Sequence, residues 1–168
     1  GWNCRIEFAH RSVDGIRYTM TQDKLHLGLD QDDDGITTLT LIPNPTNQRG
    51  GVVVLDEWLP DQLEIAFDQI EAGPEPSGFI LASASPRVFI AGADLAEIES
   101  KDDVELFRYL EKGARAYIRI THLPCPSVAI IAGSALGGGL EIAMHCDGLI
   151  GVDTPEGEKP YLVGLPEA

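Results

Sequence analysis

Three consecutive glycines and a nearby carboxylate form the part of the sequence best suited to chemistry. Gly137, Gly138 and Gly139 lie between two apolar stretches, and Glu141 follows two residues later. Glycines at a strand-to-helix junction let backbone N–H groups approach an anion closely, although a tight structural turn would use the same residues. The spacing matches neither the dinucleotide fingerprint nor the phosphate loop, so a nucleotide phosphate is not the expected ligand.

A second loop of small residues has the composition to act together with the glycines. It reads IAGAD from Ile90 to Asp94 and follows an apolar segment. Alone, the loop is better explained by packing at the end of a strand. Two such loops at one edge of a sheet can each aim one N–H group at a single carbonyl oxygen, which stabilises an oxyanion. The pair therefore predicts chemistry next to a carbonyl group.

Carboxylates are the candidates for moving protons beside that carbonyl. Glu141 is either a favourable charge in the first turn of a helix or a reactive group held among apolar neighbours. Glu167, in GLPE, is either a solvated acid or a second reactive group. His122 and His145 have no nucleophile motif beside them and are interpreted as structural. The acidic run at 30–34 lacks the later residues of a calcium-binding loop, so no metal site is predicted.

The elements that must position these residues alternate between strand and helix patterns. Apolar alternation at 25–29 and 36–42 predicts an antiparallel hairpin around the turn DQDDDG. Helical spacing predicts a helix from Leu59 to Ile70, with Gly73 just past its end. Apolar runs bounded by breakers predict strands at 78–83 and 126–133.

A second helix is expected at about 102–120. Ser100 followed by Asp103 supplies its capping signal, and its apolar face is predicted to consist of Phe107, Leu110, Ala114 and Tyr117. Strands separated by helices imply right-handed crossovers and a largely parallel α/β sheet. Ligands bind beyond the carboxyl ends of such strands, where both small-residue loops are expected to lie.

Composition limits the class of protein. The chain has 168 residues, enough for one domain, and its net charge of −15 opposes binding to nucleic acid or to anionic membrane surfaces. No apolar run approaches the roughly 20 residues of a membrane-spanning helix. The three cysteines are widely spaced, which predicts no disulfide framework or zinc site and favours a reducing compartment. Residues 1–22 are interpreted as an N-terminal extension, with a short extra strand as the alternative.

Taken together, the loops and glutamates resemble the enoyl-CoA hydratase/isomerase family, also called the crotonase family. PRVFIAGADLAEI resembles the first oxyanion-loop motif of that family, PCPSVAIIAGSALGGGLEIAMHCD resembles the second motif with its following helix, and VGLPEA resembles the start of the third. The similarity is closest to the hydratase portion of multifunctional fatty-acid oxidation alpha subunits. It implies a crotonase-like ββα spiral, with residues 23–168 forming the N-terminal part of the domain and the fold incomplete at the C-terminus.

The resemblance also implies roles for individual residues. The N–H groups of Ala93 and Gly138 would form an oxyanion hole for the thioester oxygen. Glu141 would activate water for addition at C3, and Glu167 would deliver a proton to C2. The mostly apolar pocket expected around these carboxylates would raise their pKa values. The remaining loop residues would line the substrate site: Ala91, Gly92, Asp94, Gly137 and Gly139.

Three functions remain open at this point. The first is hydration of 2-enoyl-CoA in fatty-acid β-oxidation, which the presence of both glutamates favours. The second is Δ3,Δ2-enoyl-CoA isomerisation, and the third is an inactive acyl-CoA-binding or assembly module. The resemblance implies no separate cofactor, because coenzyme A is part of the substrate. It also implies a homotrimer or a place in a fatty-acid oxidation complex, in a bacterial cytoplasm or in mitochondria, and a local cationic patch near the pocket mouth for the anionic CoA.

Overall fold

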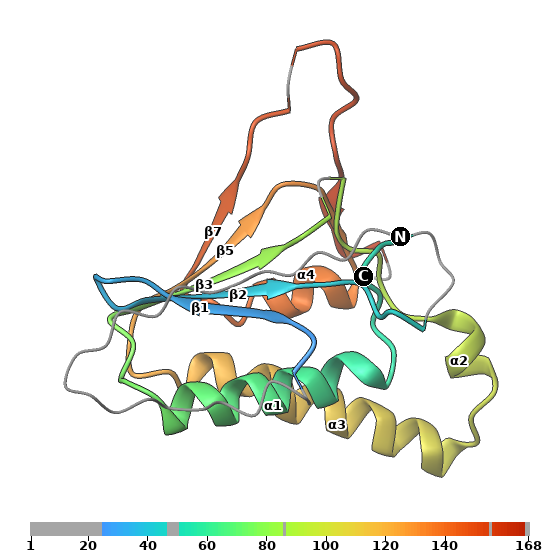
Figure 1. Cartoon of the computed structure of the whole chain (residues 1–168). Helices are drawn as coiled ribbons and strands as arrows, with labels where there is room; N and C mark the ends of the chain where they lie inside the picture. The colour runs from blue at the N-terminus through green and yellow to red at the C-terminus, as the bar shows by residue number, and fades with distance from the viewer. Residues whose placement is uncertain (1–24, 47–50, 86, 155, 167–168) are drawn as a thin grey trace, which may run out of the picture.

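The computed structural model describes residues 25–46, 51–85, 87–154 and 156–166, apart from the side chain of Leu95. The N-terminal extension assigned to residues 1–22 lies outside the described residues. Two sheets and four helices form the fold within the described ranges (Figure 1). The larger sheet has the strand order β1-β2-β3-β5-β7 and the smaller sheet has the order β4-β6-β8.

The larger sheet begins with the antiparallel hairpin that the alternating residues predict. Strand β1 (Gly28–Gln31) pairs antiparallel with β2 (Ile36–Leu41). The carboxylate of Asp32 closes the turn by accepting hydrogen bonds from the N–H groups of Asp34 and Ile36, at 3.0 and 2.9 Å. The remaining strands run parallel to β2, which confirms the α/β class: β3 (Gly78–Ser83), β5 (Ser127–Ile131) and β7 (Gly148–Gly151).

The strand expected at 126–133 is confirmed as β5, and a smaller sheet of short strands, which the sequence patterns do not predict, follows it. The chain leaves β5 and enters β6 (Ser134–Leu136), which pairs parallel with β4 (Val88–Ile90) and with β8 (Val163–Gly164). A side chain at Gly133 would place its Cβ 2.3 Å from the carbonyl carbon of Arg87. This glycine therefore lets the chain pass against another backbone as it moves from one sheet to the other.

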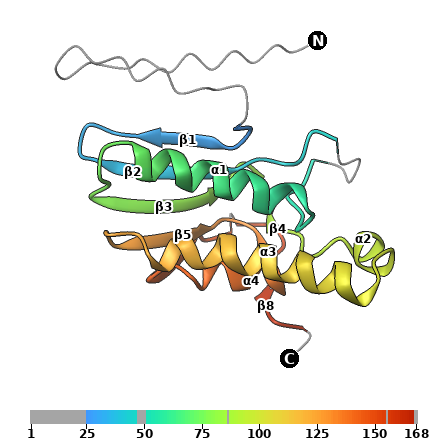
Figure 2. The ribbon, with the colours of Figure 1, turned by 90° about the horizontal axis from the view of Figure 1, so that it is seen from below.

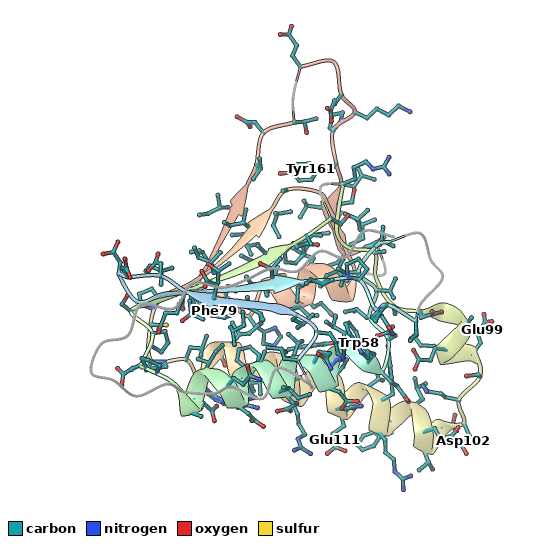
Figure 3. The ribbon with its side chains drawn as sticks, in the orientation of Figure 1. Trp58, Phe79, Glu99, Asp102, Glu111 and Tyr161 are labelled. Carbon is teal, nitrogen blue, oxygen red and sulfur yellow. The ribbon has the colours of Figure 1, made fainter. Side chains whose placement is uncertain are left out.

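Helices α1 (Trp58–Ala72) and α3 (Asp103–Thr121) lie side by side against one face of the larger sheet (Figures 1 and 2). Helix α1 agrees with the prediction, and Phe79 of β3 packs between sheet and helices at 1% exposure (Figure 3). Two shorter helices, α2 (Leu95–Glu99) and α4 (Gly138–Ala143), follow the two small-residue loops.

The apolar face predicted for α3 is wrong at three of its four residues and right at Tyr117, which packs against the core, and the predicted cap is wrong. Phe107 and Leu110 are 67% and 57% exposed, and Ala114 is also exposed. The helix turns a different face inward because small residues there permit close packing; its buried residues are Tyr109, Gly113, Ala116 and Ile120.

The true N-cap of α3 is Asp102, whose carboxylate accepts from the N–H groups of Val104 and Glu105 (Figure 3). The side chain of Glu105 accepts in turn from the N–H of Asp102, which completes a capping box. Ser100 instead ends α2, where its hydroxyl donates to the carbonyl of Glu97. The carboxylate of Asp102, in the position immediately before the helix, reaches the unpaired N–H groups of the first turn, whereas Ser100 lies two residues earlier.

Arg119 joins the two long helices. Its guanidinium contacts Glu64, Asp68 and Glu71 of α1 at 2.6, 2.8 and 2.7 Å. The same group lies 5.4 Å from the centroid of the Phe67 ring. One side chain of α3 thus pairs with three carboxylates along α1 and covers an aromatic ring of the core.

Replacing Arg119 with alanine is expected to lower the free energy of unfolding by about 1 to 2 kcal/mol, through lost ion pairs and lost packing on Phe67. Urea unfolding followed by circular dichroism measures this change. Arg115→Ala, at an exposed position of the same helix, is the matched control. Equal losses for the two variants would contradict the role assigned to Arg119.

Candidate functional site

The smaller sheet brings the two small-residue loops to one edge. Val88 of β4 pairs with Ser134 of β6 and Ile90 pairs with Ala135, in parallel register. The carboxyl ends of both strands therefore meet, and the loops 91–94 and 137–139 follow directly from them. This juxtaposition, which the sequence could only suggest, is the basis of the site.

The first loop is held by Leu55, which lies in the segment before α1. The N–H of Leu55 donates to the carbonyl of Gly92 at 2.9 Å, and the N–H of Asp94 donates to the carbonyl of Leu55 at 3.0 Å. Gly92 has φ of +90°, a left-handed conformation that suits glycine. Ala93 lies opposite Leu55 in a parallel bridge. The alternation of such a ladder turns the N–H of Ala93 to the other side of the segment.

The glycines of the second loop are required by close packing. Gly137 has φ of +53°, and its N–H donates to the carbonyl of Gly164 at 3.0 Å. A Cβ at Gly139 would lie 2.8 Å from both the Cβ and the carbonyl oxygen of Ile90. Gly138 and Gly139 open α4, so their N–H groups precede the first intrahelical hydrogen bonds.

Leu55 connects both loops. A Cβ at Gly138 would lie 2.4 Å from Cδ1 of Leu55, so the glycine backbone rests directly on that side chain. Ala93 is bridged to the backbone of the same leucine. The two N–H groups named as the oxyanion hole, those of Ala93 and Gly138, therefore belong to residues that contact one buried leucine.

Glu141 lies over the second loop. Its N–H donates to the carbonyl of Gly137 at 3.1 Å, and its Oε2 would be 3.6 Å from a Cβ at Gly138. The side chain is exposed, in contrast to the enclosed apolar pocket that the sequence predicts. The helix explains this difference, because its buried positions, among them Leu140 and Ile142, face the core while Glu141 faces outward.

Glu167 lies outside the described residues, so its role stays a prediction. Strand β8, just before it, pairs with β6 through Ala135 and Val163 and through Leu136 and Gly164. The chain preceding Glu167 thus reaches the edge that carries the second loop.

Asp94 has a structural contact besides its predicted place in the substrate site. Its carboxylate caps α2 by accepting from the N–H groups of Ala96 and Glu97, at 3.1 and 3.4 Å. The predicted substrate contacts of Ala91, Gly92, Asp94, Gly137 and Gly139 remain predictions.

Sequence reasoning missed Leu55 and Tyr109. The hydroxyl of Tyr109, in α3, donates to the carbonyl of Leu55 at 2.7 Å, across 54 residues of chain. Neither residue stands in a motif, so only the tertiary contact identifies them. Tyr117, about two turns further along α3, packs edge-on to the His145 ring, with the ring centroids 6.2 Å apart. Burial raises the pKa of Tyr117, and the nearby Tyr109 and Glu141 act in the same direction.

Tyr109 is expected to make the folding stability of the protein fall at alkaline pH. Burial, followed by the charges of Glu97 and Asp56, raises the pKa of its hydroxyl to about 12 from 10.0. Below pH 10 the hydroxyl is protonated in folded and unfolded chains alike. Between pH 10 and 12 the unfolded chain ionises first, so stability falls.

The free energy of unfolding is therefore expected to decrease by roughly 2 kcal/mol across this window because of Tyr109 alone. Denaturant unfolding at a series of alkaline pH values measures the slope. Tyr109→Phe should reduce the slope, while the part due to Tyr117 persists. An unchanged slope would contradict the assignment to Tyr109.

Basic side chains gather near Tyr109. A pocket of about 350 Å³ is lined by the cations Lys101, Arg108 and Lys112 together with acidic and hydroxyl groups. Lys101 pairs with Glu57 at 2.7 Å, and Lys112 pairs with Asp61 at 2.7 Å. Two of the three cations are thus already engaged with carboxylates, and a cationic patch for CoA stays a prediction.

Other types of site receive no support from the described ranges. Within them, no group of His, Cys, Asp and Glu side chains could hold a metal ion. Cys125 and Cys146 are free thiols, and burial raises the pKa of Cys146 to about 12. No helix among the described residues is long and apolar enough to cross a membrane.

Comparison with known proteins agrees with this geometry. The model of the enoyl-CoA hydratase/isomerase family matches residues 46–165. The mitochondrial methylglutaconyl-CoA hydratase of Mus musculus is 34% identical over 128 residues, covering 76% of this chain and 39% of that protein. The fatty acid oxidation complex subunit alpha of Idiomarina loihiensis is 31% identical over 150 residues, covering 88% of this chain and 20% of that protein.

The fold is also shared with solved structures. The crystal structure of an enoyl-CoA hydratase from Geobacillus kaustophilus superposes with a TM-score of 0.70 at 28% identity, covering 86% of this chain and 50% of that one. The chain thus has the crotonase fold and spans half or less of the length of these relatives. With a family model matching most of its length and a shared architecture, the chain belongs to the enoyl-CoA hydratase/isomerase family.

Proposed function

We propose that this chain supplies the oxyanion loops and a catalytic base for hydration of a 2-enoyl-CoA thioester to a 3-hydroxyacyl-CoA. The observation that carries the proposal is the convergence of Ala93 and Gly138 on Leu55, with the Glu141 carboxylate lying over Gly138. Two N–H groups and one carboxylate are the groups that addition of water beside an activated carbonyl requires.

The proposed reaction begins at the thioester oxygen. Hydrogen bonds from the N–H groups of Ala93 and Gly138 draw electron density toward this oxygen, which leaves C3 open to attack. Glu141 takes a proton from water as the water oxygen bonds to C3, and the enolate then accepts a proton at C2. Glu167 is the proposed donor of that proton. Glu141 then releases its proton to solvent and Glu167 regains one, so water and the two carboxyl groups account for every proton without a separate cofactor.

The exposed side of α3 supports an acyl substrate. Tyr117 lies close enough to Glu141 to be influenced by its charge, and it contacts His145. Leu110 lies two turns before Tyr117 on the helix, and Phe107 one turn further. Both are largely exposed and apolar. An acyl chain attached to a thioester at the loops could lie along this surface.

A purified-protein assay with crotonyl-CoA tests the proposed function. Hydration removes the conjugated double bond, so the ultraviolet absorbance of the enoyl thioester falls and 3-hydroxybutyryl-CoA is formed. A 3-enoyl-CoA converted to its 2-enoyl isomer without hydration would favour the isomerase function. Calorimetric binding of acyl-CoA without any product would favour a binding module. Absence of both binding and turnover would refute the proposal.

The biological setting is part of the same proposal. A role in fatty-acid β-oxidation is supported by the similarity to the Idiomarina subunit, and a mitochondrial location by the similarity to the mouse hydratase; a bacterial cytoplasm is the alternative. Assembly as a homotrimer or within a fatty-acid oxidation complex is proposed on the family resemblance. Light scattering of the purified protein measures the mass of the assembly.

A further inference from the structure

The carbonyl of Leu55 accepts two hydrogen bonds from distant parts of the fold. One comes from the N–H of Asp94 at 3.0 Å and the other from the hydroxyl of Tyr109 at 2.7 Å. Tyr109 is only 9% exposed and belongs to the face of α3 that packs inward. The first oxyanion loop is thereby tied through Leu55 to the longest helix of the described structure.

Leu55 is the shared support of both proposed oxyanion donors. Its backbone is bridged to Ala93, and its side chain fills the space against Gly138. A shift of this one residue would therefore move both N–H groups relative to the carbonyl they are proposed to hold. The orientation of oxyanion donors has large effects on rate, because they act where charge develops in the transition state.

Tyr109 is well suited to hold Leu55 in place. Lys101 lies 5.4 Å from the centroid of its ring, and the tyrosine side chain is buried. The hydroxyl is protonated, and thus a hydrogen-bond donor, throughout the neutral range, and its raised pKa extends this state into the alkaline range. The single proton of the hydroxyl is directed to the Leu55 carbonyl, so Tyr109 acts on the loops through this leucine.

We propose that Tyr109 is a positioning residue that fixes Leu55 and, through it, the oxyanion N–H groups of Ala93 and Gly138. This inference rests on the proposed hydratase function. It goes beyond that function by assigning rate control to a side chain of α3 that lies outside every sequence motif. Loss of the hydroxyl should weaken transition-state stabilisation while ground-state binding of the CoA thioester changes little.

The test compares Tyr109→Phe with the wild-type protein. We expect kcat for crotonyl-CoA to fall about tenfold or more, with KM largely unchanged, because the lost interaction acts mainly in the transition state. Isotope-edited infrared spectroscopy of a bound, carbonyl-labelled enoyl thioester provides the second measurement. The wild-type protein should lower the carbonyl stretching frequency, and the variant should lower it less.

Tyr161→Phe is the matched control. The Tyr161 hydroxyl also directs its single proton toward backbone carbonyls, with those of Ile131 and Val152 within hydrogen-bond distance at 2.9 and 2.8 Å. It lies on the side of the larger sheet away from α1 and α3 (Figure 3). This control should change thermal stability without moving the carbonyl frequency. Incorporating 4-aminophenylalanine at position 109 restores a donor and should restore kcat, which separates hydrogen bonding from any folding defect.

The results of these experiments separate the positioning role of Tyr109 from the proposed hydratase function on which it rests. A wild-type protein that hydrates crotonyl-CoA, with Tyr109→Phe matching its kcat and carbonyl frequency, would overturn the positioning role and leave the function intact. Failure of 4-aminophenylalanine to restore kcat in a folded protein would also overturn it. A wild-type protein that binds the thioester without lowering the carbonyl frequency would overturn the oxyanion hole and the positioning role together.

Discussion

We expect Glu141→Gln to lower kcat for enoyl-CoA hydration by roughly 100- to 10,000-fold, the range for removal of a general base. Glutamine keeps the size of the side chain and loses the ability to take a proton from water. Glu141 is exposed, so the exchange leaves the core and the hydrogen bonds of α4 unchanged. Steady-state kinetics with crotonyl-CoA measures the effect.

Glu111→Gln controls for the loss of one negative charge. Glu111 is an exposed residue of α3, and the exchange there should leave kcat near the wild-type value (Figure 3). Thermal unfolding should confirm that both variants remain folded. Full hydratase activity in Glu141→Gln would refute the assignment of this residue as the base, whatever the result for Glu111.

The second large effect is expected from Gly138→Pro, compared with Gly138→Ala. Proline removes the N–H proposed to bind the thioester oxygen, and loss of one oxyanion donor costs roughly 100- to 1,000-fold in kcat. Gly138 is the first residue of α4, a position where proline is compatible with a helix. The preceding Gly137, at φ +53° and ψ −133°, is outside the α region that proline disfavours in its neighbour.

Gly138→Ala isolates the effect of the N–H group. Both substitutions add a Cβ that meets Cδ1 of Leu55, the mobile end of a side chain that can adjust. Only proline also removes the donor. The ratio of the two kcat values therefore reports the hydrogen bond, and the infrared shift of a bound carbonyl should be reduced in the proline variant. Equal kcat values for the two variants would show that the N–H of Gly138 is not an oxyanion donor.

Local sequence patterns predicted those elements whose stability depends on near neighbours. The hairpin around Asp32, helix α1 and strand β3 follow from alternation, helical spacing and turn residues, and the structure confirms them. The predicted face of α3 was wrong at three of its four residues because two apolar faces compete on that helix. Packing against α1 selects the face with Gly113 and Ala116, where small residues allow close contact.

The division of the chain between two sheets was equally hidden from local patterns. The run PSVAIIAG contains one strand, β5, as predicted, but nothing within it indicates that the chain then crosses to a second sheet, where Gly133 passes against Arg87. The chain changes sheets at a contact with Arg87, 46 positions earlier, and the periodicity of the run cannot indicate a contact with a residue so distant in the sequence. The exposure of Glu141 has a similar origin, because helix orientation decides which side of α4 faces the core.

By itself, the sequence determined the two small-residue loops, the glutamate that follows the glycines and the family resemblance they carry. Only the tertiary structure decided that Ala93 and Gly138 would meet on Leu55, and that Tyr109 would hold the carbonyl of that leucine. The physical reason is that loop composition is a local property of the sequence. The direction in which a backbone N–H group points depends instead on packing between segments far apart in the chain.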